Sequence, residues 1–89
     1  MTYRTEVSNL FRDALQDWVM NNKRIALKIF DLMRVIERTP YEGIGKPERL
    51  KHEFSGLWSR RIDHEHRIVY KVDETSEVIV FVSCIGHYT

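Results

Sequence analysis

The sequence predicts an α+β fold, with an N-terminal helical hairpin packed on one face of a mostly antiparallel, twisted β-sheet. Apolar residues recur at three- and four-residue steps in the first part of the chain, as in amphipathic helices. From about residue 49 the repeat changes to two, as in strands. Between these halves, residues 40–47 hold both prolines and two of the four glycines, which indicates a loop. One sheet face therefore stays available for a site.

Two helices are predicted, separated by a gap short enough for a helical hairpin. Ser8 is a suitable N-cap for the first helix. The core-facing stripe of this helix consists of Leu10, Phe11, Ala14, Leu15, Trp18 and Val19. Asn21-Asn22 interrupts the pattern, and a second helix begins near Lys23 and ends before Pro40. Its apolar face consists of Ile25, Ile29, Leu32, Met33 and Ile36. Such stripes are typical of core packing rather than of cofactor binding.

The second half of the chain predicts a β-meander. Alternating segments separated by turn residues indicate strands near 49–54, 57–62, 66–72 and 78–85. Residues 3–7 give a weaker signal for an additional short edge strand.

Composition indicates one domain over residues 1–89, with no apolar run near the roughly 20 residues that a membrane span needs. The single cysteine, Cys84, excludes an internal disulfide and fits a cytoplasmic location. Net charge is only +1, but residues 46–71 carry seven Lys/Arg against four Asp/Glu. Binding free RNA through counterion release alone would require a more basic chain, so the charge indicates a focused anion site.

The predicted hairpin at 63–65 places Arg61 opposite Arg67 if its turn is symmetric. Ile62, Ile68 and Tyr70 then face the core, and the two arginines share the other face with Lys71. Like charges directly opposite each other are destabilising unless an anion bridges them. Guanidinium groups match phosphate oxygens, so these residues predict either a phosphate site or a solvated basic face.

Three further residues have side chains suited to acid–base chemistry. Glu48 lies between Lys46 and Lys51, where nearby cations favour the ionised form that a general base requires. His87 and Tyr88 lie at the exit of the last strand, and an imidazole is a natural proton donor to a leaving oxygen. Taken singly, each of the three could also be an ordinary surface residue.

Two other motifs give weak signals. His64-Glu65-His66 could contribute zinc ligands, but further ligands would have to converge from elsewhere, with His52 and Cys84 as the conceivable ones. Residues 43–46 resemble a phosphate-binding loop only superficially, because the remaining spacing and the following helix are missing. No metal or cofactor is therefore predicted, and Cys84 is interpreted as a buried apolar residue.

Taken together, the second helix and the meander resemble the YoeB toxins of the RelE/ParE superfamily, which belong to type II toxin–antitoxin systems. The resemblance covers residues 23–88. Its most specific segments are 38–43, 45–52, 55–62, 65–70 and the pair His87-Tyr88.

This resemblance implies a toxin that enters the ribosomal A site and cleaves mRNA there without a metal ion. The 2′-hydroxyl would attack the adjacent phosphate and leave a cyclic phosphate and a 5′-hydroxyl. Glu48 then corresponds to the general base, Arg67 to the cation that stabilises the transition state, His87 to the general acid and Tyr88 to a supporting residue. Lys51 and Arg61 correspond to phosphate-binding cations, and we group Lys46 with them. Implied partners are the mRNA-programmed ribosome, a YefM-like antitoxin and a second copy of the chain.

The sequence departs from the family pattern in three places. Residues 1–22 match poorly, Ile85 stands where a basic residue is expected, and Thr89 follows Tyr88. Two other functions stay open at this stage: a gyrase-directed toxin resembling the ParE proteins, and a non-catalytic module that binds RNA or protein. The presence of Glu48, Arg67 and His87 argues against the first, and the lack of exposed aromatic-glycine strand motifs argues against ordinary RNA-recognition modules.

Overall fold

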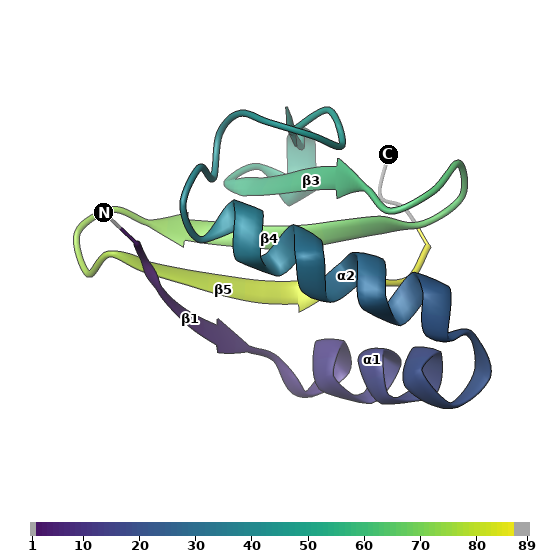
Figure 1. Cartoon of the computed structure of the whole chain (residues 1–89). Coiled ribbons are helices and arrows are strands. Elements are labelled where there is room, and N and C mark those ends of the chain that lie inside the picture. Colours follow the sequence, from purple (N-terminus) through teal and green to yellow (C-terminus); the bar gives the residue numbers. More distant parts are fainter. Residues whose placement is uncertain (1, 87–89) are drawn as a thin grey trace.

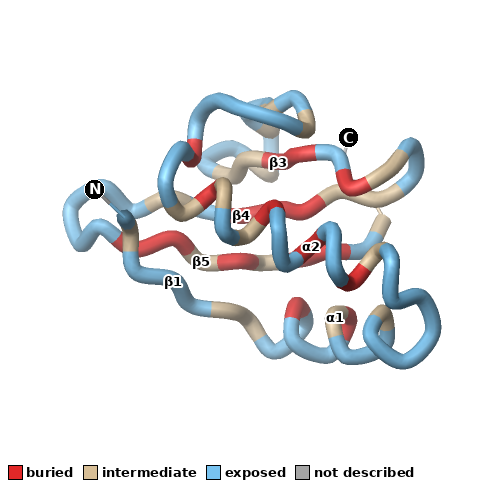
Figure 2. The backbone as a smooth tube through the Cα atoms, in the orientation of Figure 1, coloured by how far each residue is buried: buried red, intermediate tan, exposed pale blue. Residues whose placement is uncertain are grey.

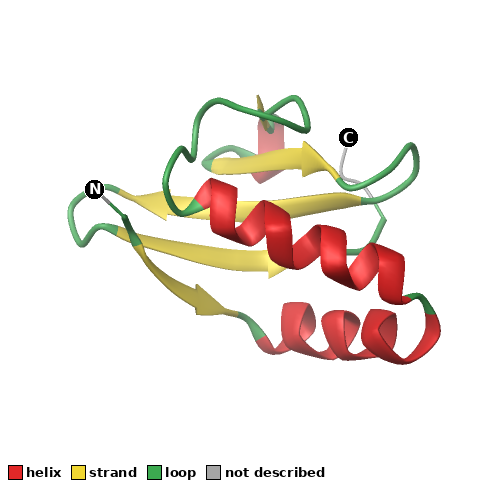
Figure 3. Ribbon diagram, viewed as in Figure 1, coloured by secondary structure: helices red, strands yellow, loops and turns green. Residues whose placement is uncertain are grey.

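A computed structural model describes residues 2–86 and contains two helices and a five-stranded sheet (Figure 1). The helices are α1 (Asn9–Asn21) and α2 (Lys23–Ile36). The strands are β1 (Arg4–Val7), β2 (Glu48–Arg49), β3 (Leu57–Arg61), β4 (Arg67–Asp73) and β5 (Val78–Ser83), with a short 3-10 helix at His52–Phe54. Both helices lie against the same face of the sheet, which confirms the predicted α+β architecture (Figure 3).

The sheet has the strand order β1-β5-β4-β3-β2. β1 pairs in parallel with β5, whereas the other three pairs are antiparallel. The weak edge strand predicted for residues 3–7 is therefore present, and the strands predicted near 57–62, 66–72 and 78–85 are confirmed, with bounds that differ by one or two residues. Within residues 2–86, neither helix is long and apolar enough to cross a membrane.

The strand predicted for 49–54 is wrong beyond its first residue. β2 spans only Glu48–Arg49, and its regular pairing with β3 ends at Arg49 and Trp58. His52 adopts φ +57°, outside the region that strands use. Hydrogen bonds from Phe54 N to Lys51 O and from Ser55 N to His52 O then coil the chain into the 3-10 turn. The turn moves Lys51 out of the sheet.

Both helices begin at side-chain caps. Ser8 Oγ accepts a hydrogen bond from Phe11 N at 3.0 Å, as predicted. Asn22 Oδ1 accepts a hydrogen bond from Ile25 N at 3.3 Å, and the backbone N–H of Asn22 donates to Trp18 O at the end of α1. One asparagine therefore ends the first helix and starts the second.

The core lies between the helices and the sheet, and red segments in Figure 2 mark it. The second predicted stripe is confirmed, because Ile29, Leu32 and Ile36 are buried. In the first stripe, the predicted burial of Leu10 and Val19 is wrong, since both side chains are exposed. α1 lies at the periphery of the sheet (Figure 1), so a narrower strip of its surface is covered.

A fully buried arginine, Arg60, lies among the apolar residues of the core. It has the same strand parity as Ile62 and Trp58, so the alternation of β3 directs it to the helix-covered side. Its Nε donates to Tyr70 Oη at 3.1 Å. Its two terminal nitrogens donate to three carbonyls of the loop after α2: Thr39 O, Glu42 O at 2.9 Å and Ile44 O at 3.3 Å. Backbone carbonyls, not a carboxylate, therefore satisfy this charge.

The loop at 39–45 curves around the Arg60 side chain. Gly43 and Gly45 have φ of +119° and +86°, and a Cβ on either would lie 3.1 Å from an Arg60 atom. Tyr70 Oη, which accepts from Arg60, in turn donates to Pro40 O at 2.6 Å. The glycine-containing segment thus directs carbonyl groups at a cation. This arrangement is the opposite of a phosphate loop, which directs N–H groups at an anion.

We predict that Arg60→Met lowers the free energy of unfolding by about 3–5 kcal/mol, because it leaves the buried Tyr70 hydroxyl and several loop carbonyls without their donor. Arg61→Met is the matched control: Arg61 is the next residue and is exposed, so its substitution should change stability by less than about 0.5 kcal/mol. Urea unfolding of the two variants measures both values. Equal midpoints would show that Arg60 does not hold the loop.

Candidate active site

The pairing register brings three predicted site residues to the sheet face turned away from the helices. Glu48 pairs with Ser59, and Arg61 pairs with Arg67. Residues that pair directly share a face, as do residues two apart in a strand, so Glu48, Arg61 and Arg67 lie on one face. Ile68, next to Arg67, is fully buried on the opposite side. The predicted pairing of Arg61 with Arg67 is confirmed.

Strand geometry gives the distance between Glu48 and Arg67 on this face. Glu48 and Arg67 are separated by two strand spacings and by two residues along the strands, or about 12 Å between Cα atoms. Long side chains on both sides can therefore reach one phosphodiester group between them. Ser59 and Val69, which lie between the two residues in the register, are only 7% and 1% exposed. The centre of this face is thus closely packed, and the charged groups lie around it.

The Arg67 guanidinium is held by the turn that precedes β4. Its Nη1 donates to Asp63 O at 3.0 Å and to His66 O at 3.2 Å. These two contacts occupy one terminal nitrogen and leave Nε and Nη2 as donors for an anion. A guanidinium held in this way loses little further side-chain entropy when it binds.

Asp63 fixes the shape of that turn. Its Oδ1 accepts from the backbone N–H of Glu65 at 2.9 Å and of His66 at 2.6 Å. Burial raises the pKa of this carboxyl, but the hydrogen bonds from His66 and Glu65 outweigh burial and leave the pKa lowered. Ile62 N donates to His66 O at 2.9 Å, which confirms the predicted symmetric turn. Asp63 is therefore ionised near neutral pH and orders the segment that anchors Arg67.

Of the predicted phosphate-binding lysines, Lys46 lies close to Arg61 and Lys51 lies farther away. Arg61 N donates to Gly45 O at 2.7 Å, which brings the residues just before β2 alongside the end of β3. Lys51 precedes the 3-10 turn, at the other end of β2. In the part of the chain that the structure describes, Lys46, Lys51 and Arg61 form no ion pair, so their charges are available to an anion.

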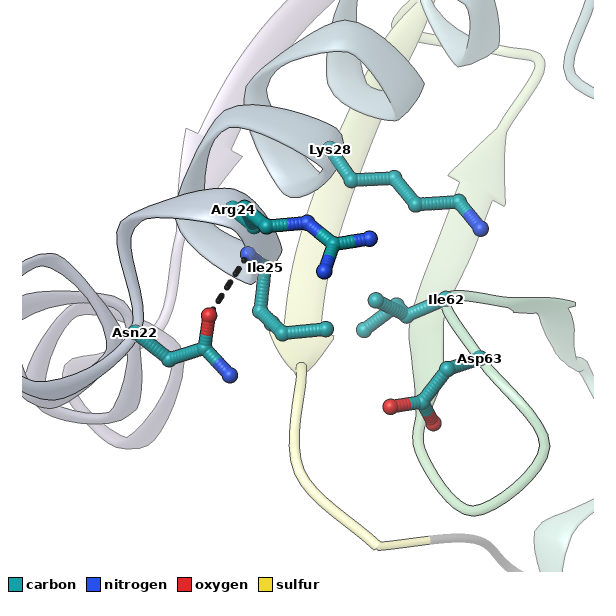
Figure 4. A pocket seen from close by; sticks show the side chains of 6 residues that line it. All are labelled: Asn22, Arg24, Ile25, Lys28, Ile62 and Asp63. Carbon is teal, nitrogen blue, oxygen red and sulfur yellow. Dashed lines mark hydrogen bonds between the residues drawn. The ribbon is translucent and has the colours of Figure 1, made fainter.

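Cations also line two adjoining surface pockets between α2 and the end of β3, which sequence reasoning missed. Figure 4 shows Arg24 and Lys28 extending from α2 toward Ile62 and Asp63 around a pocket of about 280 Å³. A neighbouring pocket of about 480 Å³ includes Lys28, Arg61 and His64. The i, i+4 spacing of Arg24 and Lys28 could have indicated their common helix face.

The zinc interpretation of His64-Glu65-His66 finds no support in the geometry. Among residues 2–86, no group of three or more His, Cys, Asp or Glu side chains is arranged to hold a metal ion. His66 Nδ1 already accepts a hydrogen bond from Gly86 N. Cys84 is buried, and burial raises the pKa of its thiol to about 12, so it is not available as a thiolate.

His87 and Tyr88 lie outside the described residues, so their predicted roles stay predictions. The segment that precedes them is fixed beside Arg67, because Arg67 N donates to Gly86 O at 2.8 Å. Gly86, the last described residue, therefore lies next to Arg67 at the start of β4.

Comparisons with known proteins show the family to which this chain belongs. The model of the YoeB-like toxins of bacterial type II toxin–antitoxin systems matches residues 8–88. Toxin YoeB from Escherichia coli (strain K12) is 51% identical over 71 residues, covering 80% of this chain and 82% of the relative. Toxin YoeB from Mycobacterium bovis is 46% identical over 83 residues, covering 90% of this chain and 95% of the relative.

Solved structures give the same result. A YoeB/ParE toxin from Agrobacterium tumefaciens superposes with a TM-score of 0.90 at 39% identity, covering 96% of this chain and 99% of that one. A YoeB dimer from Staphylococcus aureus gives a TM-score of 0.86 at 39% identity over 99% of this chain and 100% of that one. The poorly matching N-terminal residues thus keep the shared fold, and the family match reaches back to residue 8. This chain therefore belongs to the YoeB-like toxins of bacterial type II toxin–antitoxin systems.

Proposed function

We propose that this toxin is an endoribonuclease that cleaves mRNA in the ribosomal A site and thereby inhibits translation. The observation that carries the proposal is the common face of Glu48, Arg61 and Arg67, where an anionic side chain lies across from two cations. Such a face suits a reaction that removes a proton and increases the negative charge on a phosphate.

The proposed chemistry is attack of a ribose 2′-hydroxyl on the adjacent phosphate. Glu48 removes the hydroxyl proton as general base. Arg67 stabilises the charge on the non-bridging oxygens, His87 protonates the departing 5′-oxygen, and Tyr88 supports this end of the site. Lys46, Lys51 and Arg61 bind the phosphates of the strand. The P–O bond to the 5′-oxygen breaks as the new bond forms, which yields a cyclic phosphate and a 5′-hydroxyl with no redox step.

The proposed partners are the mRNA-programmed ribosome and an antitoxin. A YoeB–YefM complex is known from Staphylococcus aureus, at 40% identity to this chain. We propose a YefM-like antitoxin with an acidic, aromatic segment that covers the unpaired cations near Arg61. A homodimer is proposed in the same way, because the Staphylococcus aureus YoeB structure is a dimer. All these partners fit a cytoplasmic location.

We predict that cleavage requires the ribosome. The net charge of +1 gives little general affinity for RNA, so substrate positioning has to come from the larger particle. The measurement is a comparison of cleavage rates on free mRNA and on mRNA bound to programmed ribosomes, with 5′ ends mapped and with Glu48→Gln as the inactive control. Similar rates on both substrates would contradict the proposal. An absence of cleavage together with inhibition of gyrase would favour the gyrase-directed alternative.

We also predict that the reaction needs no metal ion held by the toxin. Arg67 and its neighbouring cations can supply the charge that a metal would otherwise provide at the phosphate. Toxin dialysed against EDTA should cleave programmed ribosomes at the rate of untreated toxin, with magnesium restored to keep the ribosomes intact. Activity that returned only when zinc was added would revive the zinc interpretation of His64 and His66.

Arg67→Lys should lower the single-turnover cleavage rate by about 10²-fold, equivalent to about 3 kcal/mol. A lysine keeps the charge, but its single ammonium group cannot hold the two turn carbonyls and also present a planar donor edge to the phosphate. Arg34→Lys is the matched control, because Arg34 is exposed on α2. Thermal melts of all variants accompany the rates. A wild-type rate for Arg67→Lys would reduce Arg67 to a structural cation.

A further inference from the structure

Three hydrogen bonds join backbone groups of the segment after β5 to α1, to the turn before β4 and to Arg67. Trp18 Nε1 of α1 donates to Cys84 O at 3.0 Å. Gly86 N donates to His66 Nδ1 at 2.9 Å, and Gly86 O accepts from Arg67 N at 2.8 Å. We call these three contacts the exit clamp. Both polar groups of Gly86 are thus paired, although Gly86 lies beyond the last residue of the strand.

The side chains of the clamp also support each other. The rings of Trp18 and His66 meet edge to face, with centroids 4.9 Å apart and planes at 75°. An Nδ1 that accepts a hydrogen bond carries no proton, so the His66 proton sits on Nε2, which lies 3.7 Å from Glu65 Oε1. The His66 side chain is only 16% exposed. Its ring is therefore fixed in position and in tautomer by contacts from α1, the turn and the chain exit.

The clamp determines how the chain leaves the sheet. Gly86 is the last residue that the structure describes, and hydrogen bonds hold both its N–H and its carbonyl oxygen. Gly86 also has φ +68°, which a glycine adopts without strain. Arg67 contributes its backbone N–H to the same contact, so the position of the exit is set directly relative to Arg67.

We propose that His66 is a positioning residue, which together with Trp18 fixes Gly86, the residue to which the proposed general acid His87 is attached. This inference rests on the proposed nuclease function and deepens it. His66 touches neither the RNA nor the reacting atoms; it acts through Gly86. A small displacement of a catalytic group costs rate rather than binding, so the clamp acts on the chemical step.

Two substitutions test the hydrogen-bond acceptor of His66 and the aromatic ring of His66 independently of each other. His66→Phe keeps a ring against Trp18 but removes the acceptor for Gly86 N. His66→Asn loses most of the ring but retains an oxygen near the position of Nδ1. Trp18→Phe is a third variant, which keeps an aromatic ring against His66 and removes only the donor to Cys84 O.

The experiment measures single-turnover cleavage over a range of programmed-ribosome concentrations. We expect His66→Phe to lower the maximal rate by about 10- to 100-fold, with the half-saturating ribosome concentration unchanged. His66→Asn should recover most of that rate, and Trp18→Phe should show a smaller loss than His66→Phe. Amide hydrogen exchange of the isolated toxin gives a readout that needs no activity. The Gly86 amide should exchange faster in His66→Phe than in the wild type and in His66→Asn.

The outcomes distinguish this inference from the proposed function. If the wild type cleaves and His66→Phe cleaves equally fast while its Gly86 amide exchanges rapidly, the clamp is not a positioning device. Equal rate losses in His66→Phe and His66→Asn, in step with lower melting temperatures, would also overturn the inference and leave His66 a packing residue. If the wild type itself cleaves no programmed mRNA, the proposed function fails and the inference fails with it.

Discussion

The buried guanidinium of Arg60 is the constraint on which the rest of the structure depends. Moving a charge out of water is costly unless polar groups replace its hydration, and here the Tyr70 hydroxyl and the loop carbonyls do so. The loop after α2 would otherwise have little reason to adopt one conformation, since it contains two glycines with positive φ. Because its contacts with Arg60 hold the loop, Gly45 O accepts a hydrogen bond from Arg61 N, and the chain then continues into β2. The position of Glu48 therefore depends on a buried cation twelve residues later in the chain.

The alternation of β3 places its two neighbouring arginines, Arg60 and Arg61, on opposite faces of the sheet. Arg60 faces the core and is fully buried, whereas Arg61 faces solvent opposite Arg67. The first is neutralised by fixed dipoles and organises the loop. The second keeps its charge unpaired beside another arginine, an unfavourable arrangement that an anion can relieve. A single pairing register thus fixes both the direction of Arg60 toward the loop and the face that carries Arg61 and Arg67.

Local sequence pattern was sufficient to predict the two helices, the cap at Ser8, the start of the second helix near Lys23 and the register of the hairpin at 63–65. It failed at residues 50–54, where a residue with positive φ coils the chain despite a strand-like pattern. It also missed Arg60, although the parity of Trp58 and Ile62 was visible, because alternation alone does not say what would pair with a buried charge. The site was predicted largely through the family resemblance, and the structure adds the support around Arg67 and Gly86.

The parallel pairing of β1 with β5 has a consequence for how the toxin acquires its fold. Ser8 Oγ donates to Val82 O, a contact between residues 74 apart in sequence, and β5 lies between β1 and β4 in the sheet. During synthesis, therefore, the first strand emerges long before its partner exists, and no local contact can substitute for that partner. A nascent chain that ends before residue 78 lacks β5, the strand that joins β1 to β4, so its N-terminal helices lack part of the core on which they pack. The five-stranded sheet can therefore form only after nearly all of the described residues have been synthesised.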